Sequence, residues 1–202
     1  KNNKFNTKDI KDLIDNFRLT IDSETMLEPI GEDLPILVCY PTDRNVLQVP
    51  VRIRTKHMFD QVSAYENAFN SGIDFKIFFE WYRNQEDIEN ENKNDVKDPI
   101  LESVRQAIYA FQPQFSNLKI QRKLQRMVVD KQGVTLSITQ LSDGEKILLA
   151  LVGDLARRLA LANPHKKNPN EGEGIVLVDE IDLHLHPSLQ RDVMKRLPKT
   201  FP

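Results

Sequence analysis

The sequence predicts an α/β fold in which a parallel sheet is flanked by helices. Two short apolar runs, LPILVCY at 34–40 and GIVLVD at 174–179, have the length and β-branched content of buried strands. A long apolar helix is expected between them at 147–161, and a further helix is expected to begin at Pro187. Strands that alternate with helices in this way indicate parallel strands in a layered core. We expect the second strand to be buried on both faces.

The composition is typical of a globular protein and excludes several classes. Of the 202 residues, 40% are hydrophobic and 29% are charged. Lys and Arg number 28 against 30 Asp and Glu, so the net charge of -2 gives no overall attraction to nucleic acid. The single cysteine, Cys39, excludes a disulfide framework and a thiol cluster for zinc. No apolar run approaches the roughly 20 residues needed to cross a bilayer, and no signal peptide is evident, so we expect a cytoplasmic protein.

The N-terminal part is expected to combine a helix with strands. Apolar residues at helical spacing predict a helix over 10–17, and residues 46–54 alternate loosely, as a strand would. From 59 to about 94 the pattern becomes helical and includes the closely spaced aromatic residues of 75–82. We expect these aromatic residues to form the core of a helical insertion, with a docking face for a partner as the less favoured alternative.

The middle of the chain is expected to change from helix to strands. Asp98 is a typical N-cap and Pro99 suits the first helical position, so a helix is predicted to begin there. Alternation over 115–138, with a turn signal at 130–133, predicts antiparallel strands. The chain then divides into three parts: a helix with strands (1–56), a helical insertion (57–114), and antiparallel strands followed by the elements that carry two motifs (115–202).

The first motif is LSDGEK at 141–146. Ser142 and Glu145 have capping-box spacing, so Ser142 is expected to cap the helix that follows. The start of a helix exposes amide groups and the positive end of its dipole, and Gly144 would let an anion approach the backbone closely. The motif indicates either a phosphate-binding helix start or an ordinary capped helix. Taken alone, it favours the ordinary cap.

The second motif is VLVDEID at 176–182, which places Asp179 and Glu180 directly after a strand. Ligands bind at the carboxyl ends of strands in open α/β sheets, and two acids there call for a cation such as nucleotide-bound Mg²⁺. Asp179 would hold the metal, and Glu180 would orient and deprotonate a water molecule. The alternatives are a solvated acidic turn or, less favoured, a metal-dependent nuclease that also uses Asp182.

Together the two motifs resemble those of ABC-type ATPases, where the first is the signature sequence and the second is the Walker B strand. The segments QLSDGEKILLALVGDLARRLALANP and NEGEGIVLVDEIDLHLHP are similar to anti-phage defence ATPases of the Septu PtuA type and to retron-associated ATPases. These lie in the branch of RecF, SMC proteins and the overcoming-lysogenization nucleases. The strong resemblance covers residues 139–190, with weaker similarity at 41–54 and 124–133.

The resemblance implies a partial ABC-ATPase head, with a helical and β insertion, that hydrolyses ATP with Mg²⁺ at a head-to-head dimer interface. It assigns Mg²⁺ binding to Asp179 and the role of catalytic base to Glu180. The residues that would face the γ-phosphate of ATP or the dimer interface are Ser142, Gly144, Glu145 and Asp182. A nuclease or other effector is implied as partner, in anti-phage defence or DNA maintenance. A non-hydrolysing scaffold derived from such a head is the alternative from a different class.

Two parts of the family pattern are not found in the sequence. The Walker A loop, G-x-x-x-x-G-K-[ST], has no match among the seven glycines, and the switch histidine of the family would follow residue 202. We therefore expect a segment of a larger head, which alone neither binds ATP tightly nor hydrolyses it.

Histidines and basic residues provide two further candidates. His184 and His186 are close enough in sequence to suggest a metal site, but the resemblance explains them as D-loop and helix-entry sequence. Basic residues could form solvated strand faces, which the net charge favours, or a DNA-facing patch. They are Arg44, Arg52, Arg54, Lys119, Arg122, Lys123 and Arg126. DNA is thus a partner to be tested, and no membrane partner is expected.

Overall fold

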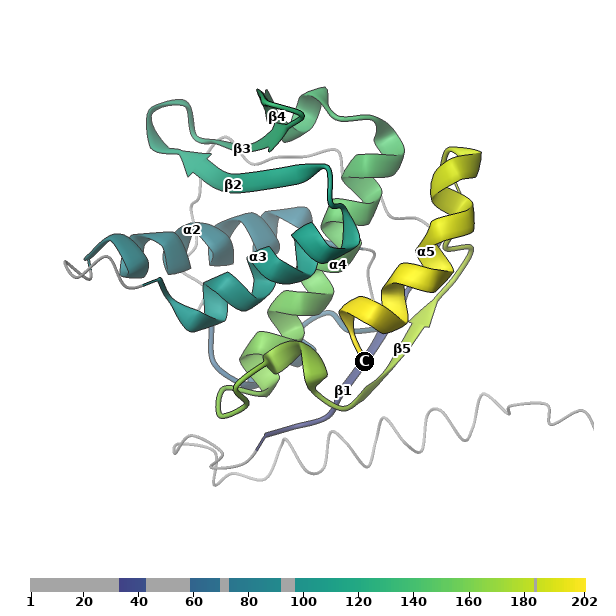
Figure 1. Cartoon of the computed structure of the whole chain (residues 1–202). Coiled ribbons are helices and arrows are strands. Elements are labelled where there is room, and N and C mark those ends of the chain that lie inside the picture. Colours follow the sequence, from purple (N-terminus) through teal and green to yellow (C-terminus); the bar gives the residue numbers. More distant parts are fainter. Residues whose placement is uncertain (1–32, 43–58, 70–72, 92–96, 184) are drawn as a thin grey trace, which may run out of the picture. The chain divides into compact units, whose positions relative to one another are not determined.

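The computed structural model describes residues 33–42, 59–69, 73–91, 97–183 and 185–202 (Figure 1). Its main elements are strand β1 (Ile36–Tyr40), the short 3-10 helix η1 (Val62–Tyr65), helices α2 (Phe75–Glu91) and α3 (Pro99–Phe111), strands β2 (Phe115–Gln121), β3 (Arg126–Lys131) and β4 (Val134–Ser137), helix α4 (Asp143–Ala162), strand β5 (Gly174–Val178) and helix α5 (Pro187–Thr200). The helix predicted over 10–17 and the strand predicted over 46–54 lie outside the described residues.

Strands β1 and β5 pair in parallel although the helices and the other strands separate them in the chain. Ile36 lies opposite Gly174, and Tyr40 lies opposite Val178. Gly174 is needed for this pairing, because a Cβ there would lie 2.6 Å from the backbone oxygen of Ile36. Strands β2, β3 and β4 form a separate antiparallel sheet. A parallel pair flanked by helices confirms the predicted α/β fold class.

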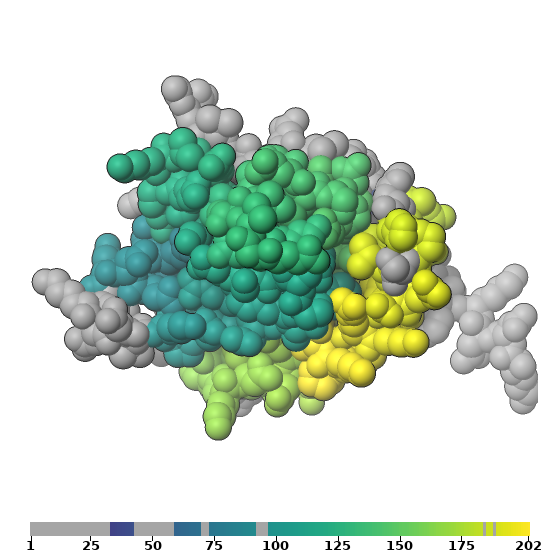
Figure 2. All heavy atoms as spheres, turned by 45° about the horizontal axis from the view of Figure 1, so that its top comes forward, coloured from purple at the N-terminus to yellow at the C-terminus, as the bar shows by residue number. Residues whose placement is uncertain are grey.

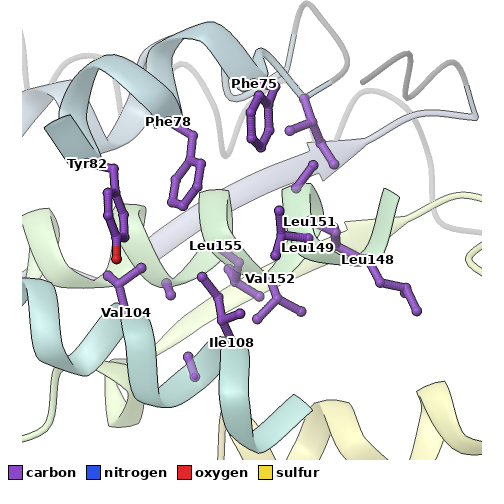
Figure 3. Close-up of a cluster of buried hydrophobic side chains, with 14 of the residues drawn as sticks. Phe75, Phe78, Tyr82, Val104, Ile108, Leu148, Leu149, Leu151, Val152 and Leu155 are labelled. Atoms are coloured by element: carbon purple, nitrogen blue, oxygen red, sulfur yellow. The ribbon is translucent and has the colours of Figure 1, made fainter. Parts of the chain in front are cut away.

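Helix α4 lies at the centre of the core and is buried on nearly all sides, as expected for a helix that is apolar around its circumference. Gly153 allows α2 to approach, because a Cβ there would lie 2.8 Å from the Phe78 ring. Trp81 and Tyr82 have no exposed surface, which confirms that the aromatic residues of α2 form core. Figure 3 shows how the three helices contribute side chains to this core: Phe75, Phe78 and Tyr82 from α2, Val104 and Ile108 from α3, and Leu148, Leu149, Leu151, Val152 and Leu155 from α4.

The region from 59 to about 94 is less continuously helical than the sequence pattern predicts. Helix α2 accounts for its second part, and Asp74 accepts a hydrogen bond from the Lys76 amide (2.9 Å) at the start of that helix. Before it, η1 ends in a turn in which Asn67 has a φ of 54°. A residue in this left-handed conformation cannot continue a right-handed helix, so the prediction is wrong there.

The predicted helix start at Asp98 and the predicted hairpin are both confirmed. The Asp98 carboxylate accepts a hydrogen bond from the Leu101 amide (2.7 Å), with proline in the first turn. Strands β3 and β4 are joined by Gln132 and Gly133, which have φ values of 51° and 83°. Two left-handed residues in succession are typical of the tight turn that matches the twist of a hairpin.

Helix α5 begins at Pro187, as predicted, and packs beside α3 (Figure 2). Arg196 connects the two helices by donating a hydrogen bond to the backbone oxygen of Phe111 (2.8 Å). Within the part of the chain that the structure describes, none of the helices combines the length and the apolar character needed to cross a membrane.

Strand β5 contradicts one expectation, because it is not buried on both faces. Its central side chains Ile175, Val176 and Leu177 are 52%, 37% and 43% exposed. Side chains alternate along a strand, so these residues expose both faces. Among the described residues β5 pairs with β1 alone, which makes it an edge strand. An apolar run predicts a strand that could be buried, but it does not determine which neighbours cover that strand.

Candidate functional site

The acidic end of β5 is attached to the end of β1 by two hydrogen bonds. The Asp179 amide donates to the backbone oxygen of Tyr40 (2.9 Å), which extends the parallel ladder by one step. The Thr42 hydroxyl donates to Oδ2 of the Asp179 carboxylate (2.9 Å). The carboxylate is therefore held at the carboxyl edge of the parallel pair, where α/β sheets bind their ligands.

The turn after Asp179 has an unusual backbone and is connected to α5. Glu180 is exposed and has a φ of 41°, a left-handed conformation that costs a non-glycine residue about 1–2 kcal/mol. Its carbonyl accepts a hydrogen bond from the Leu183 amide (2.9 Å). The carbonyl of Asp182 accepts hydrogen bonds from the Leu185 amide and the Gln190 side chain, each at 3.1 Å. The turn thus carries the exposed side chains of Glu180 and Asp182, which follow Asp179 in the sequence, on a defined backbone conformation.

The start of α4 forms the predicted capping box. The Glu145 amide donates to the Ser142 hydroxyl (3.4 Å), and the Ser142 amide donates to the Glu145 carboxylate (3.2 Å). Gly144 lies between them, is buried, and has an amide that is not part of this box. Helix starts with such amides are suited to bind anions.

Glu145 is largely buried and carries a charge that its neighbours stabilise. Its Oε1 forms an ion pair with Lys131 Nζ (2.7 Å), and its Oε2 accepts a hydrogen bond from the Ser142 hydroxyl (2.9 Å). Burial alone would raise the pKa of the Glu145 carboxyl, but Lys131 and Ser142 lower this pKa below its ordinary value. Glu145 therefore remains ionised and connects strand β3 to the start of α4.

The donors at the end of β5 suit Mg²⁺ better than they suit a softer metal. Asp179 and Thr42 offer oxygen atoms only, and Mg²⁺ binds through one or two carboxylates while water and phosphate complete its shell. No cluster of three or more His, Cys, Asp or Glu residues occurs in the described ranges, so these ranges hold no complete protein-only cage. His184 lies outside them. The backbone carbonyl of His186 accepts hydrogen bonds from the amides of Leu189 and Gln190, so His186 stands at the entry of helix α5.

Thr42 was not identified from the sequence, although a signal for it exists. It follows a buried strand by two residues, and the parallel partner of that strand ends in two acids. A hydroxyl at this point reaches the neighbouring strand end once the pairing of β1 and β5 is known. The pairing joins segments more than a hundred residues apart, and periodicity alone does not supply it.

A buried ionic cluster next to the end of β1 was also not predicted from the sequence. The Tyr40 hydroxyl donates to Asp154 (2.9 Å), and Asp154 pairs with Arg157 (2.8 Å) and Arg158 (2.7 Å). Arg158 also donates to the backbone oxygen of Ala64 (2.6 Å). Burial would raise the pKa of the Asp154 carboxyl, but the two guanidinium groups hold that pKa well below its usual range. Burial and the nearby Asp154 raise the pKa of Tyr40, so its hydroxyl stays protonated and donates.

The basic residues are partly neutralised by acids. Arg122 pairs with Glu86 (3.3 Å) and Asp87 (2.9 Å), and Arg126 donates to the Gln121 side chain (2.8 Å). The other described members, Lys119 and Lys123, are exposed, and Arg44, Arg52 and Arg54 lie outside the described residues. The pairing of Arg122 favours solvated strand faces, and the DNA-facing patch stays a prediction.

A parallel strand pair with an acidic carboxyl edge, beside a long buried helix with a serine-capped start, has the arrangement of an ATPase head. The chain belongs to the family described as "AAA domain, putative AbiEii toxin, Type IV TA system", whose model matches residues 55–200.

Named relatives agree with this family. The chain is 35% identical to the retron Ec83 probable ATPase of Escherichia coli and 34% identical to the retron Vc95 probable ATPase of Vibrio cholerae serotype O1 biovar El Tor. Each match covers 83% of this chain and 42% of the relative, so the chain spans less than half of their length. The Septu protein PtuA of Bacillus mycoides (strain KBAB4) is 37% identical over 32% of this chain and 9% of that protein. These matches confirm the predicted resemblance to retron-associated and Septu ATPases.

Proposed function

We propose that this chain is the signature and Walker B part of an ATPase that hydrolyses ATP with Mg²⁺. The observation that carries the proposal is the fixed Asp179 carboxylate at the edge of the β1–β5 pair, followed directly by the exposed Glu180. The family match and the retron relatives named as ATPases support the same reaction.

The two acids have separate roles in this proposal. Asp179 binds Mg²⁺ directly or through a water molecule, with Oδ2 oriented by Thr42. When bound, Mg²⁺ supplies Lewis-acid stabilisation of the charge on the phosphoryl oxygens. Glu180 accepts a proton from the water molecule that attacks the γ-phosphate and orients that water in line with the bond that breaks.

The start of α4 serves a nucleotide held by an opposing head. The Ser142 hydroxyl turns from Glu145 Oε2 to donate to the γ-phosphate, and the Gly144 amide donates to the same group. The helix dipole provides favourable charge for this phosphate. Glu145 acts differently, because a carboxylate repels phosphate and its oxygens already bind Lys131 and Ser142. Glu145 orients the Ser142 cap by accepting a hydrogen bond from the Ser142 amide. Asp182, in a separate role, lies toward the interface of a head-to-head dimer.

The relatives support a proposal for the cellular role. Retron and Septu names among them support a function in anti-phage defence, with DNA maintenance as the broader setting. In this role, ATP hydrolysis opens the dimer and transmits a movement to a nuclease or other effector, with DNA as a further partner. A scaffold that never hydrolyses ATP is the second candidate, but it has no requirement for a base at position 180.

The test is the Glu180→Gln substitution in the full-length protein. We expect ATP turnover to fall by at least about 100-fold while ATP binding persists, because the carboxylate that accepts the proton is lost. Glu173→Gln, an exposed acid just before β5, is the matched control and should retain turnover. Unchanged ATP turnover and dimer lifetime in Glu180→Gln would support the scaffold instead.

A further inference from the structure

Strand β1 contributes a side chain to the acidic edge that neither motif contains. We propose that Thr42 is a positioning residue, which orients the Asp179 carboxylate for Mg²⁺ through its hydroxyl. The inference rests on the proposed ATPase function and adds a residue from a segment distant in sequence from both motifs.

The end of β1 explains why a hydroxyl is needed at this position. The register places Tyr40 opposite Val178, so Pro41 is level with Asp179. Along β1 the groups that bond to β5 belong to Ile36 and Tyr40, whereas the Cys39 amide donates to Ala68, so the backbone of Pro41 also faces away from β5. Among the described residues, the backbone of β1 therefore holds Asp179 through one bond, in which the Asp179 amide donates to Tyr40. The hydroxyl of Thr42 supplies the second attachment, and this one acts on the side chain.

The attachment leaves one carboxylate oxygen for the metal. Thr42 donates to Oδ2 of Asp179, while Oδ1 has no partner among the residues that the structure describes. An exposed aspartate without such a contact samples several rotamers, and the metal would have to select one of them. Hydrogen bonds to ligating carboxylates typically change metal affinity by about 10- to 100-fold.

The support behind Thr42 is rigid. Tyr40 is 1% exposed, and its hydroxyl is bonded to Asp154, which two buried arginines hold in place. A positioning group works only if its own support does not move. The buried cluster on α4 therefore fixes the end of β1 from which Thr42 reaches Asp179.

The experiment compares Thr42→Val with Thr42→Ser in the full-length protein. Valine keeps the shape and removes the hydroxyl, whereas serine keeps the hydroxyl. We expect Thr42→Val to weaken Mn²⁺ binding in the presence of ATP, measured by electron paramagnetic resonance, by about 10- to 100-fold, with a parallel rise in the Mg²⁺ concentration for half-maximal turnover. Thr42→Ser should remain within about threefold of the wild type on both measurements.

Two further measurements separate positioning from other causes. ATP binding without metal and the melting temperature should be unchanged in Thr42→Val, because the hydroxyl is not part of the core. Wild-type Mn²⁺ binding by Thr42→Val, or equal loss in Thr42→Ser, would overturn the proposal. Thr42→Ala provides a second hydroxyl-free variant, so the proposal can still be tested if the valine protein folds poorly. Normal turnover by Glu180→Gln would instead refute the ATPase function itself.

Discussion

Helix α4 and strand β5 carry the two motifs and are both strongly apolar, yet their environments are opposite. Leu149 in α4 is 1% exposed, whereas Leu177 in β5 is 43% exposed. Helices α2 and α3 and strand β1 surround α4, while β5 has one paired neighbour among the described residues. The difference shows that α4 is held by contacts on nearly all of its sides, whereas β5 is held by its pairing with β1 and by the bond between Thr42 and Asp179 at its carboxyl end.

The largest loss in the free energy of unfolding is expected from removing Asp154, the acid at the centre of the buried ionic cluster on α4. Asp154→Ala leaves Arg157 and Arg158 buried without their common carboxylate, so we expect a loss of about 3–5 kcal/mol in the free energy of unfolding. Urea denaturation of the 202-residue chain measures it. Asp192→Ala removes a pair with Arg196 on the surface of α5 and should cost no more than about 1 kcal/mol. A loss below 1 kcal/mol for Asp154→Ala would contradict the view that this cluster fixes α4.

An intermediate loss in the free energy of unfolding, which depends on pH, is expected from a substitution of Glu145 at the start of α4. The Glu145 pKa is lowered in the folded protein, so its stabilising contribution is present above its ordinary pKa of about 4.3 and is lost as pH falls below that value. Glu145→Gln should therefore cost about 0.5–2 kcal/mol at pH 7, and the difference from wild type should shrink below about pH 4. Urea denaturation at several pH values measures this, with Glu173→Gln as the control. A difference that is constant with pH would exclude the charge as its cause.

The same contrast explains how much the sequence could predict. The capping box of Ser142 and Glu145, the start at Pro99 and the hairpin at Gln132 and Gly133 depend on residues three or four positions apart, so local patterns sufficed for them. The bond between Thr42 and Asp179 could not be predicted in this way, because it requires knowledge of which strands pair.

The prediction that β5 is buried on both faces was wrong for a related reason. An apolar run indicates that a strand can be covered by other elements, and Ile175 and Leu177 are both apolar residues of such a run. Whether it is covered depends on neighbours that the run does not specify. Helix α4 has such neighbours in β1, α2 and α3 of the same chain, so its apolar residues are buried.

The smallest effect is expected on β5, and it tests the comparison directly. Leu177→Ser removes an apolar side chain that is already 43% exposed, so the free energy of unfolding of the 202-residue chain should fall by less than about 1 kcal/mol. Leu149→Ser, the matched change in α4, should cost about 2–5 kcal/mol, because it leaves a cavity and buries a hydroxyl. Urea denaturation of both variants gives the two losses in the free energy of unfolding, which can then be compared. Similar losses at the two positions would mean that β5 is as well covered as α4, and the contrast between the two elements would then be wrong.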